Sequence, residues 1–188
     1  TPIINRTPQQ VRDFADAAPL FGFREVHVGW GTPFAVLIAV ATVLYLAVGY
    51  WLQVRNGFIL GDALSRVQAS ESVLYSRDPH LAAIGFIFTP LTAMLEIPFM
   101  LLNSVWPDLT ARAFAGSIMS AIFMAGAVVQ IFSLGSDRGL PRSYTVAITA
   151  LFAINPMIAF YGSNGMSEAP FIFFLTWAVR RLVLWMVD

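Results

Sequence analysis

The stretch that decides the fold is residues 113–136, AFAGSIMSAIFMAGAVVQIFSLGS, which holds no charged side chain. Two other runs have the same character. Residues 26–54 contain one His and otherwise no charge, and residues 143–167 contain none. A helix needs roughly 20 mainly apolar residues to cross a bilayer. Each run is long enough, so the sequence predicts a chain that crosses a membrane several times through α-helices.

The overall composition agrees with a membrane protein. Apolar residues make up 57% of the chain and charged residues 12%, whereas soluble domains carry about 25% charged residues. The net charge is zero, which gives no indication of a nucleic-acid partner. Cysteine is absent, which excludes disulfides, Cys-ligated zinc and a thiol nucleophile. The chain ends directly after an apolar stretch, so we expect it to be a fragment of a longer protein.

The predicted fold class is all-α: a polytopic membrane helix bundle with about four spans plus juxtamembrane or re-entrant helices. Residues 1–32 are expected to form an N-terminal amphipathic segment at the membrane surface. Residues 33–188 are expected to form the membrane domain. Its four spans are predicted at residues 33–53, 113–134, 144–161 and 170–181.

Residues 81–102 are the ambiguous segment. They are apolar enough to span, but Pro90, Pro98 and Glu96 are each costly in a lipid-exposed helix. We therefore predict a broken or re-entrant segment, which makes residues 55–112 a single outer loop. Counting Arg residues in the loops leaves a second arrangement open, in which this segment crosses and the N-terminus lies outside. In that arrangement Asp62 is cytoplasmic and Glu168 is outside.

The densest group of ionisable residues lies in this outer loop. Asp62 and Arg66 have i,i+4 spacing, which places them on one helix face. Leu64, Val67 and Val73 predict that this helix has an apolar side that lies against the bilayer. An Arg guanidinium pairs with phosphate through a planar fork of donors. The pattern therefore indicates a site for a phosphate-bearing lipid.

Carboxylates in the same region could act as catalytic groups at this site. A carboxylate can accept a proton from an attacking hydroxyl or hold a divalent metal. If residues 81–102 do not cross, Asp62 and Glu168 share the outer face. Structural interpretations remain beside the functional ones: a solvated helix pair for Asp62 and Arg66, a helix N-terminal acid for Glu168, and a turn residue for His80. Glu96 is harder to explain structurally, because acids inside membranes are functional by default.

Several motifs together resemble the N-terminal portion of the GT-C glycosyltransferases, in the style of the aminoarabinose transferase-like enzymes and the protein O-mannosyltransferases. After the first span comes a loop that opens with Gly61-Asp62-Ala-Leu-Ser-Arg66. A short basic turn separates the second and third spans. The motifs that complete the resemblance are Ser76-Arg77-Asp78-Pro79-His80-Leu81, Ser136-Asp-Arg-Gly-Leu-Pro-Arg142, and Asn155-Pro156 leading through Tyr161-Gly162 to Glu168.

The resemblance implies transfer of a sugar from a polyprenyl-phosphate donor on the outer face of a bacterial plasma (inner) membrane. Asp62 would be the base or charge partner of the acceptor hydroxyl, and Glu168 a supporting acid. The candidate substrate-binding residues are Arg66, Arg77, Asp78 and His80. No cofactor is assigned, and a divalent metal held by the carboxylates stays open.

A second class of function fits the same sequence. The chain would then be a small non-enzymatic membrane subunit, with membrane lipid and other membrane subunits as its partners. A fragment of a transporter is a third interpretation. A downstream sequence with further spans would favour the enzyme over the subunit.

Overall fold

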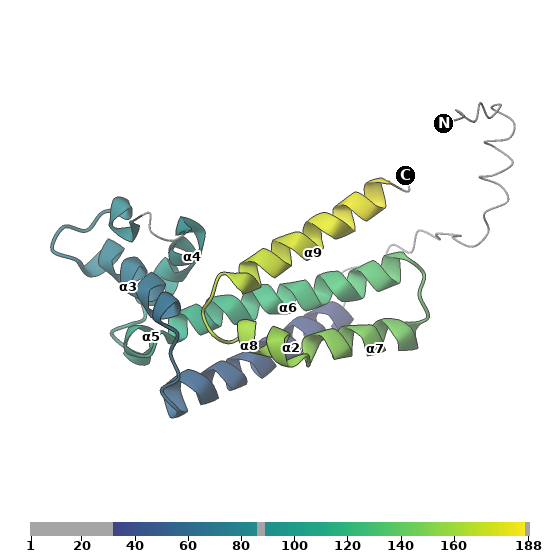
Figure 1. Cartoon of the computed structure of the whole chain (residues 1–188), viewed down its shortest axis with the longest axis horizontal. Coiled ribbons are helices and arrows are strands. Elements are labelled where there is room, and N and C mark those ends of the chain that lie inside the picture. The colour runs from purple at the N-terminus through teal and green to yellow at the C-terminus, as the bar shows by residue number, and fades with distance from the viewer. Residues whose placement is uncertain (1–31, 86–88, 187–188) are drawn as a thin grey trace, which may run out of the picture.

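The computed structural model describes residues 32–85 and 89–186, and throughout these ranges the regular elements are helices (Figure 1). The predicted all-α fold is therefore confirmed. Apart from Thr32, the predicted amphipathic segment 1–32 lies outside the described residues.

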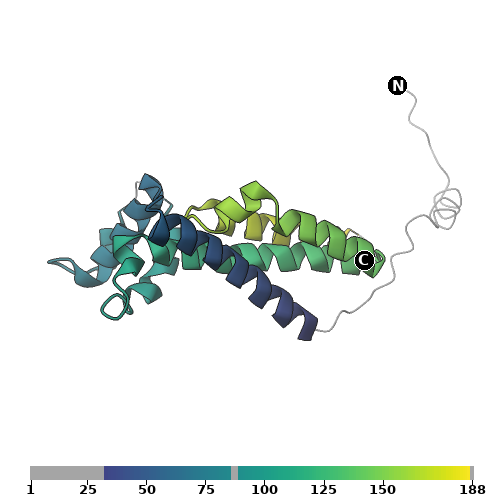
Figure 2. The ribbon, with the colours of Figure 1, turned by 90° about the horizontal axis from the view of Figure 1, so that it is seen from below.

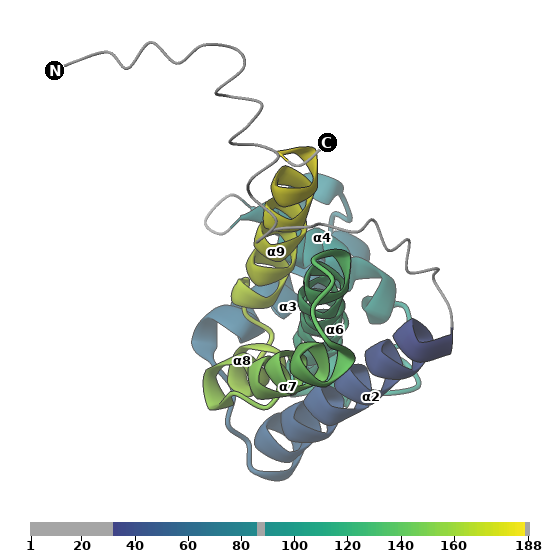
Figure 3. The ribbon, with the colours of Figure 1, turned by 90° about the vertical axis from the view of Figure 1, so that its right-hand side faces the viewer.

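Four helical elements run along the long axis of the molecule. Helix α6 lies at the centre and packs against α2, α7 and α9 (Figure 3). Two helical stretches are long and apolar enough to cross a membrane, Phe34–Arg55 and Phe114–Asp137. The four elements are α2 (Thr32–Gly49) with the π-helical η2 (Tyr50–Arg55), α6 (Phe114–Asp137), α7 (Arg142–Ala153) with α8 (Pro156–Tyr161), and α9 (Glu168–Trp185).

The third and fourth predicted spans differ from simple apolar helices. The third is interrupted at Asn155, whose side chain accepts a hydrogen bond from the Met157 amide at 2.9 Å and so caps the start of α8. Pro156 occupies the first position of α8, where its missing N–H costs nothing. The fourth, α9, carries Glu168, Arg180 and Arg181 within its 18 residues. Both elements nevertheless run along the long axis of the molecule.

A second group of shorter helices gathers at one end of the four long elements (Figures 1 and 2). Their core, to which the start of α6 contributes, consists of the buried residues Val67, Met100, Leu109, Ala113, Phe114 and Ala115. The elements are α3 (Gly61–Tyr75), η3 (Leu81–Ile84), α4 (Pro90–Met100) and α5 (Asp108–Ala111).

The apolar side of α3 faces protein. Val67 is fully buried in this core and Leu64 packs against it. The prediction that Val67 lies against the bilayer was therefore wrong. Helices α4, α5 and the start of α6 pack against α3, and the residues buried there include Ala63, Arg66 and Ser70 as well as Val67.

As predicted, residues 81–102 are broken and do not form one continuous helix. The 3₁₀ turn η3 ends at Gly85, whose φ of 70° favours glycine. Helix α4 begins separately, with Pro90 at its first position. At 1.5 Å per residue, its 11 residues rise about 16 Å, roughly half the hydrocarbon core of a bilayer.

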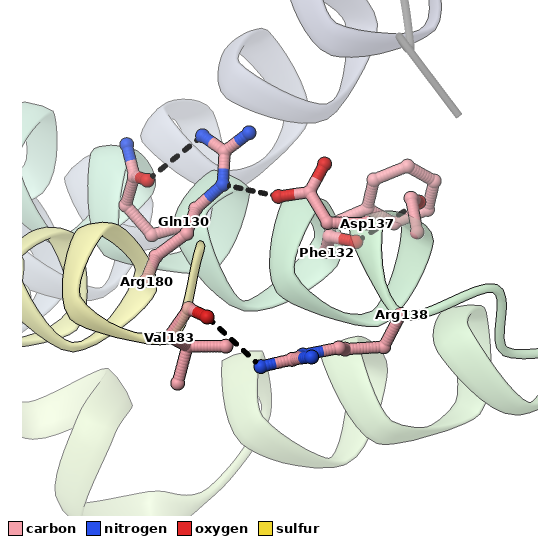
Figure 4. A network of polar contacts seen from close by, with 7 residues as sticks. Gln130, Phe132, Asp137, Arg138, Arg180 and Val183 are labelled. Carbon is pink, nitrogen blue, oxygen red and sulfur yellow. Dashed lines mark hydrogen bonds and ion pairs between the residues drawn. The ribbon is translucent and has the colours of Figure 1, made fainter. Parts of the chain in front are cut away.

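At the opposite end of the molecule, polar side chains join α6 to α9 (Figure 4). Arg180 Nε donates to Asp137 Oδ2 at 2.6 Å, and Arg180 Nη1 donates to Gln130 Oε1 at 3.3 Å. Arg138 Nη2 donates to the Val183 carbonyl at 3.2 Å. The Arg180 and Asp137 side chains are only 18% and 11% exposed. An apolar environment tolerates such charges when they are paired, so this pair lets α9 carry an Arg beside α6.

Helices α2 and α6 approach each other closely at Gly49. A Cβ at this position would lie 2.8 Å from the Ser163 carbonyl oxygen and 3.0 Å from Ser117 Oγ. One turn earlier, the buried Tyr45 donates its hydroxyl to the Ala153 carbonyl at 3.0 Å. Only a residue without a side chain lets α2 meet both α6 and the turn that contains Ser163.

We expect Gly49→Ala to destabilise the protein. The methyl group would collide with a backbone carbonyl, and overpacking of this kind costs about 1–3 kcal/mol, more than the gain of up to about 1 kcal/mol in helix propensity. Thermal unfolding in detergent should show a lower Tm. Gly61→Ala is the matched control, because a Cβ there meets nothing within 4 Å. Equal Tm values for the two variants would contradict the close approach.

Candidate functional site

The candidate site lies where the group of short helices meets the four long elements. Three small residues allow this junction. A Cβ on Gly116 of α6 would lie 2.9 Å from Gly165 Cα, and a Cβ on Gly165 would lie 3.2 Å from Ala63 Cβ. Gly165 also has a φ of 77°, a conformation that favours glycine. The start of α3, the start of α6 and the turn before α9 therefore touch one another.

Buried polar groups fix the turn of residues 162–167. Ser117 Oγ lies within hydrogen-bonding distance of Gln53 Oε1 and of the Ser163 carbonyl, at 2.7 and 2.5 Å. Gln53 Nε2 donates to the Asn164 carbonyl at 3.3 Å. The Met166 amide donates to Asn164 Oδ1 at 3.0 Å. Helices η2 and α6 thus position the turn that leads into Glu168.

Arg66 reaches from α3 to this turn. Its side chain is buried, and Nη1 donates to Met166 Sδ at 3.5 Å. Asp62 lies one helical turn earlier at the exposed start of α3, next to Ala63, which contacts Gly165. Glu168 lies in the first turn of α9, two residues after Met166. Three of the predicted site residues, Asp62, Arg66 and Glu168, therefore belong to one junction.

Glu96 is a further acid at this junction. It is fully buried on α4, and Ser70 Oγ lies 3.3 Å from its Oε2. Its Oε1 would lie 3.3 Å from a Cβ on Gly116, so the carboxyl group reaches α6. Helix α4 lies outside the two stretches long enough to cross a membrane. Burial raises the pKa of Glu96 to about 8, although the Ser70 hydrogen bond and the charge of Arg66 lower it in part.

Two carboxylate oxygens at the junction are buried without a hydrogen bond. Within the described residues, neither Glu96 Oε1 nor Glu168 Oε2 has a partner. A buried carboxylate oxygen that makes no hydrogen bond is costly. For Glu96 a bound proton removes the charge and most of this cost. For Glu168, the first turn of α9 supplies a favourable helix dipole, as the structural interpretation predicts.

The other predicted substrate-binding residues lie elsewhere. Arg77, Asp78 and His80 are exposed beyond the far end of α3, about 20 Å from its start at 1.5 Å per residue. His80 Nδ1 lies 2.6 Å from the Asp78 carbonyl, which is a local turn contact. The structure thus separates these three residues from Asp62 and Glu168. Among the described residues, no group of three or more His, Asp or Glu side chains could hold a metal.

Glu96 stands out in the sequence as an unusual acid, but nothing there indicates its partners. The sequence also does not identify the other buried polar residues of the junction, which include Ser70, Gln53 and Asn164. A Ser, Gln or Asn is ordinary in a helix or a turn. The position of Glu96 in an apolar segment is the one sign that the sequence offers. Its contact with Ser70 depends on how α4 folds back on α3.

Comparison with known proteins adds no relative, because no family profile, curated protein or solved structure matches this chain.

Glu96 should make stability depend on pH. The folded protein keeps this proton up to about pH 8, whereas the unfolded chain loses it near the ordinary value of 4.5. The free energy of unfolding should therefore fall as the pH rises between these values, by up to about 1.4 kcal/mol per pH unit. Glu96→Gln mimics the protonated form, so the variant should lack this slope and be the more stable protein above pH 8.

Unfolding temperatures at pH 5.5 and pH 8.5 measure this effect in detergent. Asp78→Asn is the control, because it removes an exposed carboxylate and should leave the wild-type pH profile intact. If Glu96→Gln loses stability with pH as steeply as the wild type, Glu96 is not the buried proton carrier.

Proposed function

We propose that this chain is part of a multi-pass membrane enzyme that transfers a sugar from a polyprenyl-phosphate donor at the outer face of a bacterial plasma membrane. One observation carries the proposal. Arg66 on α3 and Met166 before α9 are 100 residues apart in sequence, yet they are in contact. This contact brings the loop that follows the first span to the turn between the third and fourth.

The exposed side chains support four spans. Helices α7 and α9 present large apolar residues on their outer surfaces, and contiguous exposed patches of this kind require a cover other than water. Lipid is that cover in this proposal, so α7–α8 and α9 cross the membrane as the third and fourth spans. The exposed residues are Val146, Ile148 and Leu151 on α7, and Phe171, Phe174, Leu175, Trp177, Val179 and Leu182 on α9.

The chemistry follows from the burial of each group. Asp62 is exposed, so its carboxylate is accessible to an acceptor hydroxyl as base or charge partner. Arg66 is buried beside the 162–167 turn, where its guanidinium would stabilise negative charge on the leaving lipid phosphate. Glu168 supports the site from α9. Given their distance, Arg77, Asp78 and His80 would contact remote parts of a substrate.

The topology can be tested in the Cys-free chain with isosteric single-Cys variants. Ser65→Cys and Ser167→Cys lie at the proposed outer end, and Ser143→Cys lies at the other end. In sealed right-side-out vesicles, an impermeant thiol reagent should label the thiols at positions 65 and 167, because they share the outer face, but not the thiol at position 143. Labelling of positions 65 and 167 from opposite sides would contradict the topology.

Asp62→Asn should abolish sugar transfer while the protein remains folded in the membrane. The amide can neither accept the proton nor balance charge, and loss of a general base costs about 10²–10⁴-fold. Glu168→Gln should have a smaller effect. The assay is transfer of labelled sugar from polyprenyl phosphate by the full-length protein in proteoliposomes.

Glu71→Gln is the matched control for this assay. It makes the same carboxylate-to-amide change on α3, but the Glu71 side chain faces Asn103. Its activity should equal the wild type. Near-wild-type turnover by Asp62→Asn would remove Asp62 from the site. Absence of turnover by the wild type with every polyprenyl-linked sugar tested would favour the non-enzymatic subunit.

A further inference from the structure

The segment between α4 and α5 exposes an unusual amount of apolar surface. Leu101, Leu102 and Val105 are 63%, 55% and 84% exposed, and Trp106 is 39% exposed. Residues 97–107 contain no charged side chain. In water such a loop would be unfavourable, because these side chains gain nothing from solvent.

This loop is nevertheless well ordered by its own hydrogen bonds. The amides of Leu102 and Val105 donate to the carbonyls of Phe99 and Leu102, each at 3.0 Å, and the Trp106 amide donates to the Leu102 carbonyl at 2.9 Å. These hydrogen bonds provide partners for backbone groups, which a lipid environment could not hydrogen-bond.

The Asn103 side chain ties the same loop to its neighbours. Asn103 Nδ2 donates to Glu71 Oε1 of α3 at 3.3 Å, and Thr110 Oγ1 of α5 donates to Asn103 Oδ1 at 2.8 Å. Met100, just before the loop, is fully buried in the core of the short helices. With Asn103 turned inward and Met100 anchored, the exposed side chains of Leu101, Leu102 and Val105 are held outward.

The position of the loop is set by aromatic contacts with the ends of two long helices. The Trp106 ring lies 5.1 Å from the Phe114 ring at the start of α6, and the Tyr50 ring at the start of η2 lies 6.0 Å from the same Phe114 ring. Arg112 Nη1 donates to the Val54 carbonyl at 2.8 Å. The loop is thus level with the end of the first span.

We propose that residues 101–106 form a membrane-inserted wedge, whose apolar side chains enter the interfacial region of the outer leaflet. The inference rests on the membrane location in the proposed function. The wedge lies near η2, whose Tyr50 and Trp51 at the end of the first span are themselves exposed. Trp and Tyr concentrate at the level of the lipid head groups, and Trp106 with Tyr50 completes such a belt here.

Lipid fits this surface better than a protein partner. The loop offers no charge, and the amides of Leu102, Asn103, Val105 and Trp106 are already paired within it. It therefore offers few of the donors that give protein interfaces their specificity. Inserted in the leaflet, the wedge holds the short helices against the membrane. It thereby fixes α3, with Asp62 and Arg66, near the depth of a lipid phosphate.

Spin labels on single-Cys variants test the wedge in proteoliposomes. The variants are Val105→Cys in the wedge, Gln68→Cys on the exposed polar side of α3, and Val40→Cys, which is 61% exposed on α2. Collision with oxygen reports lipid and collision with a water-soluble nickel chelate reports water. Labels at 105 and 40 should collide preferentially with oxygen, with 105 the shallower, and the label at 68 with the chelate.

The three labels separate the two proposals. If the label at 105 collides with the chelate as readily as the label at 68, while the label at 40 remains in lipid, the wedge is wrong and the membrane location stands. If the label at 40 also collides with the chelate, the membrane location itself fails. A label at 105 shielded from both reagents would overturn the wedge in favour of a protein partner.

Discussion

The close contact between Gly116 of α6 and Gly165 before α9 is the constraint on which the rest of the structure depends. A methyl group at Gly116 would lie 2.9 Å from Gly165 Cα, and one at Gly165 would lie 3.2 Å from Ala63 Cβ. These small residues let three backbones meet at one point. Without that approach, Arg66 would not reach Met166, and the acid-bearing ends of α3 and α9 would belong to different surfaces.

The burial of α6 at the centre of the bundle explains how this junction is held. Most of α6 is buried, unlike α2, whose large apolar side chains point outward. Packing alone gives little direction between helices in lipid, so small residues and interhelical hydrogen bonds fix their register. Ser117 with Gln53 supplies that register at one end of α6, and Asp137 with Arg180 supplies it at the other.

Features that depend on local chemistry could be predicted from the sequence. The uncharged runs indicated α2 and α6, and Pro90 with Glu96 indicated the break before α4. Asn155-Pro156 carried a readable signal for the interruption between α7 and α8, but the apolar run around it favoured one span. The sequence could not predict what covers the apolar side of a helix. Val67 has the same amphipathic pattern whether lipid or α4 covers it, and the Glu96–Ser70 contact exists only once α4 folds back.

Burial of Glu96 has a consequence for the charge of the junction. Because burial raises its pKa to about 8, this carboxyl group is mostly protonated at neutral pH and adds little negative charge to the junction. The Arg66 guanidinium is buried beside it, where interactions between charges are stronger than at an exposed surface. The folding of α4 over α3 thus sets the charge of the junction, because it buries Glu96 beside Ser70 and Arg66.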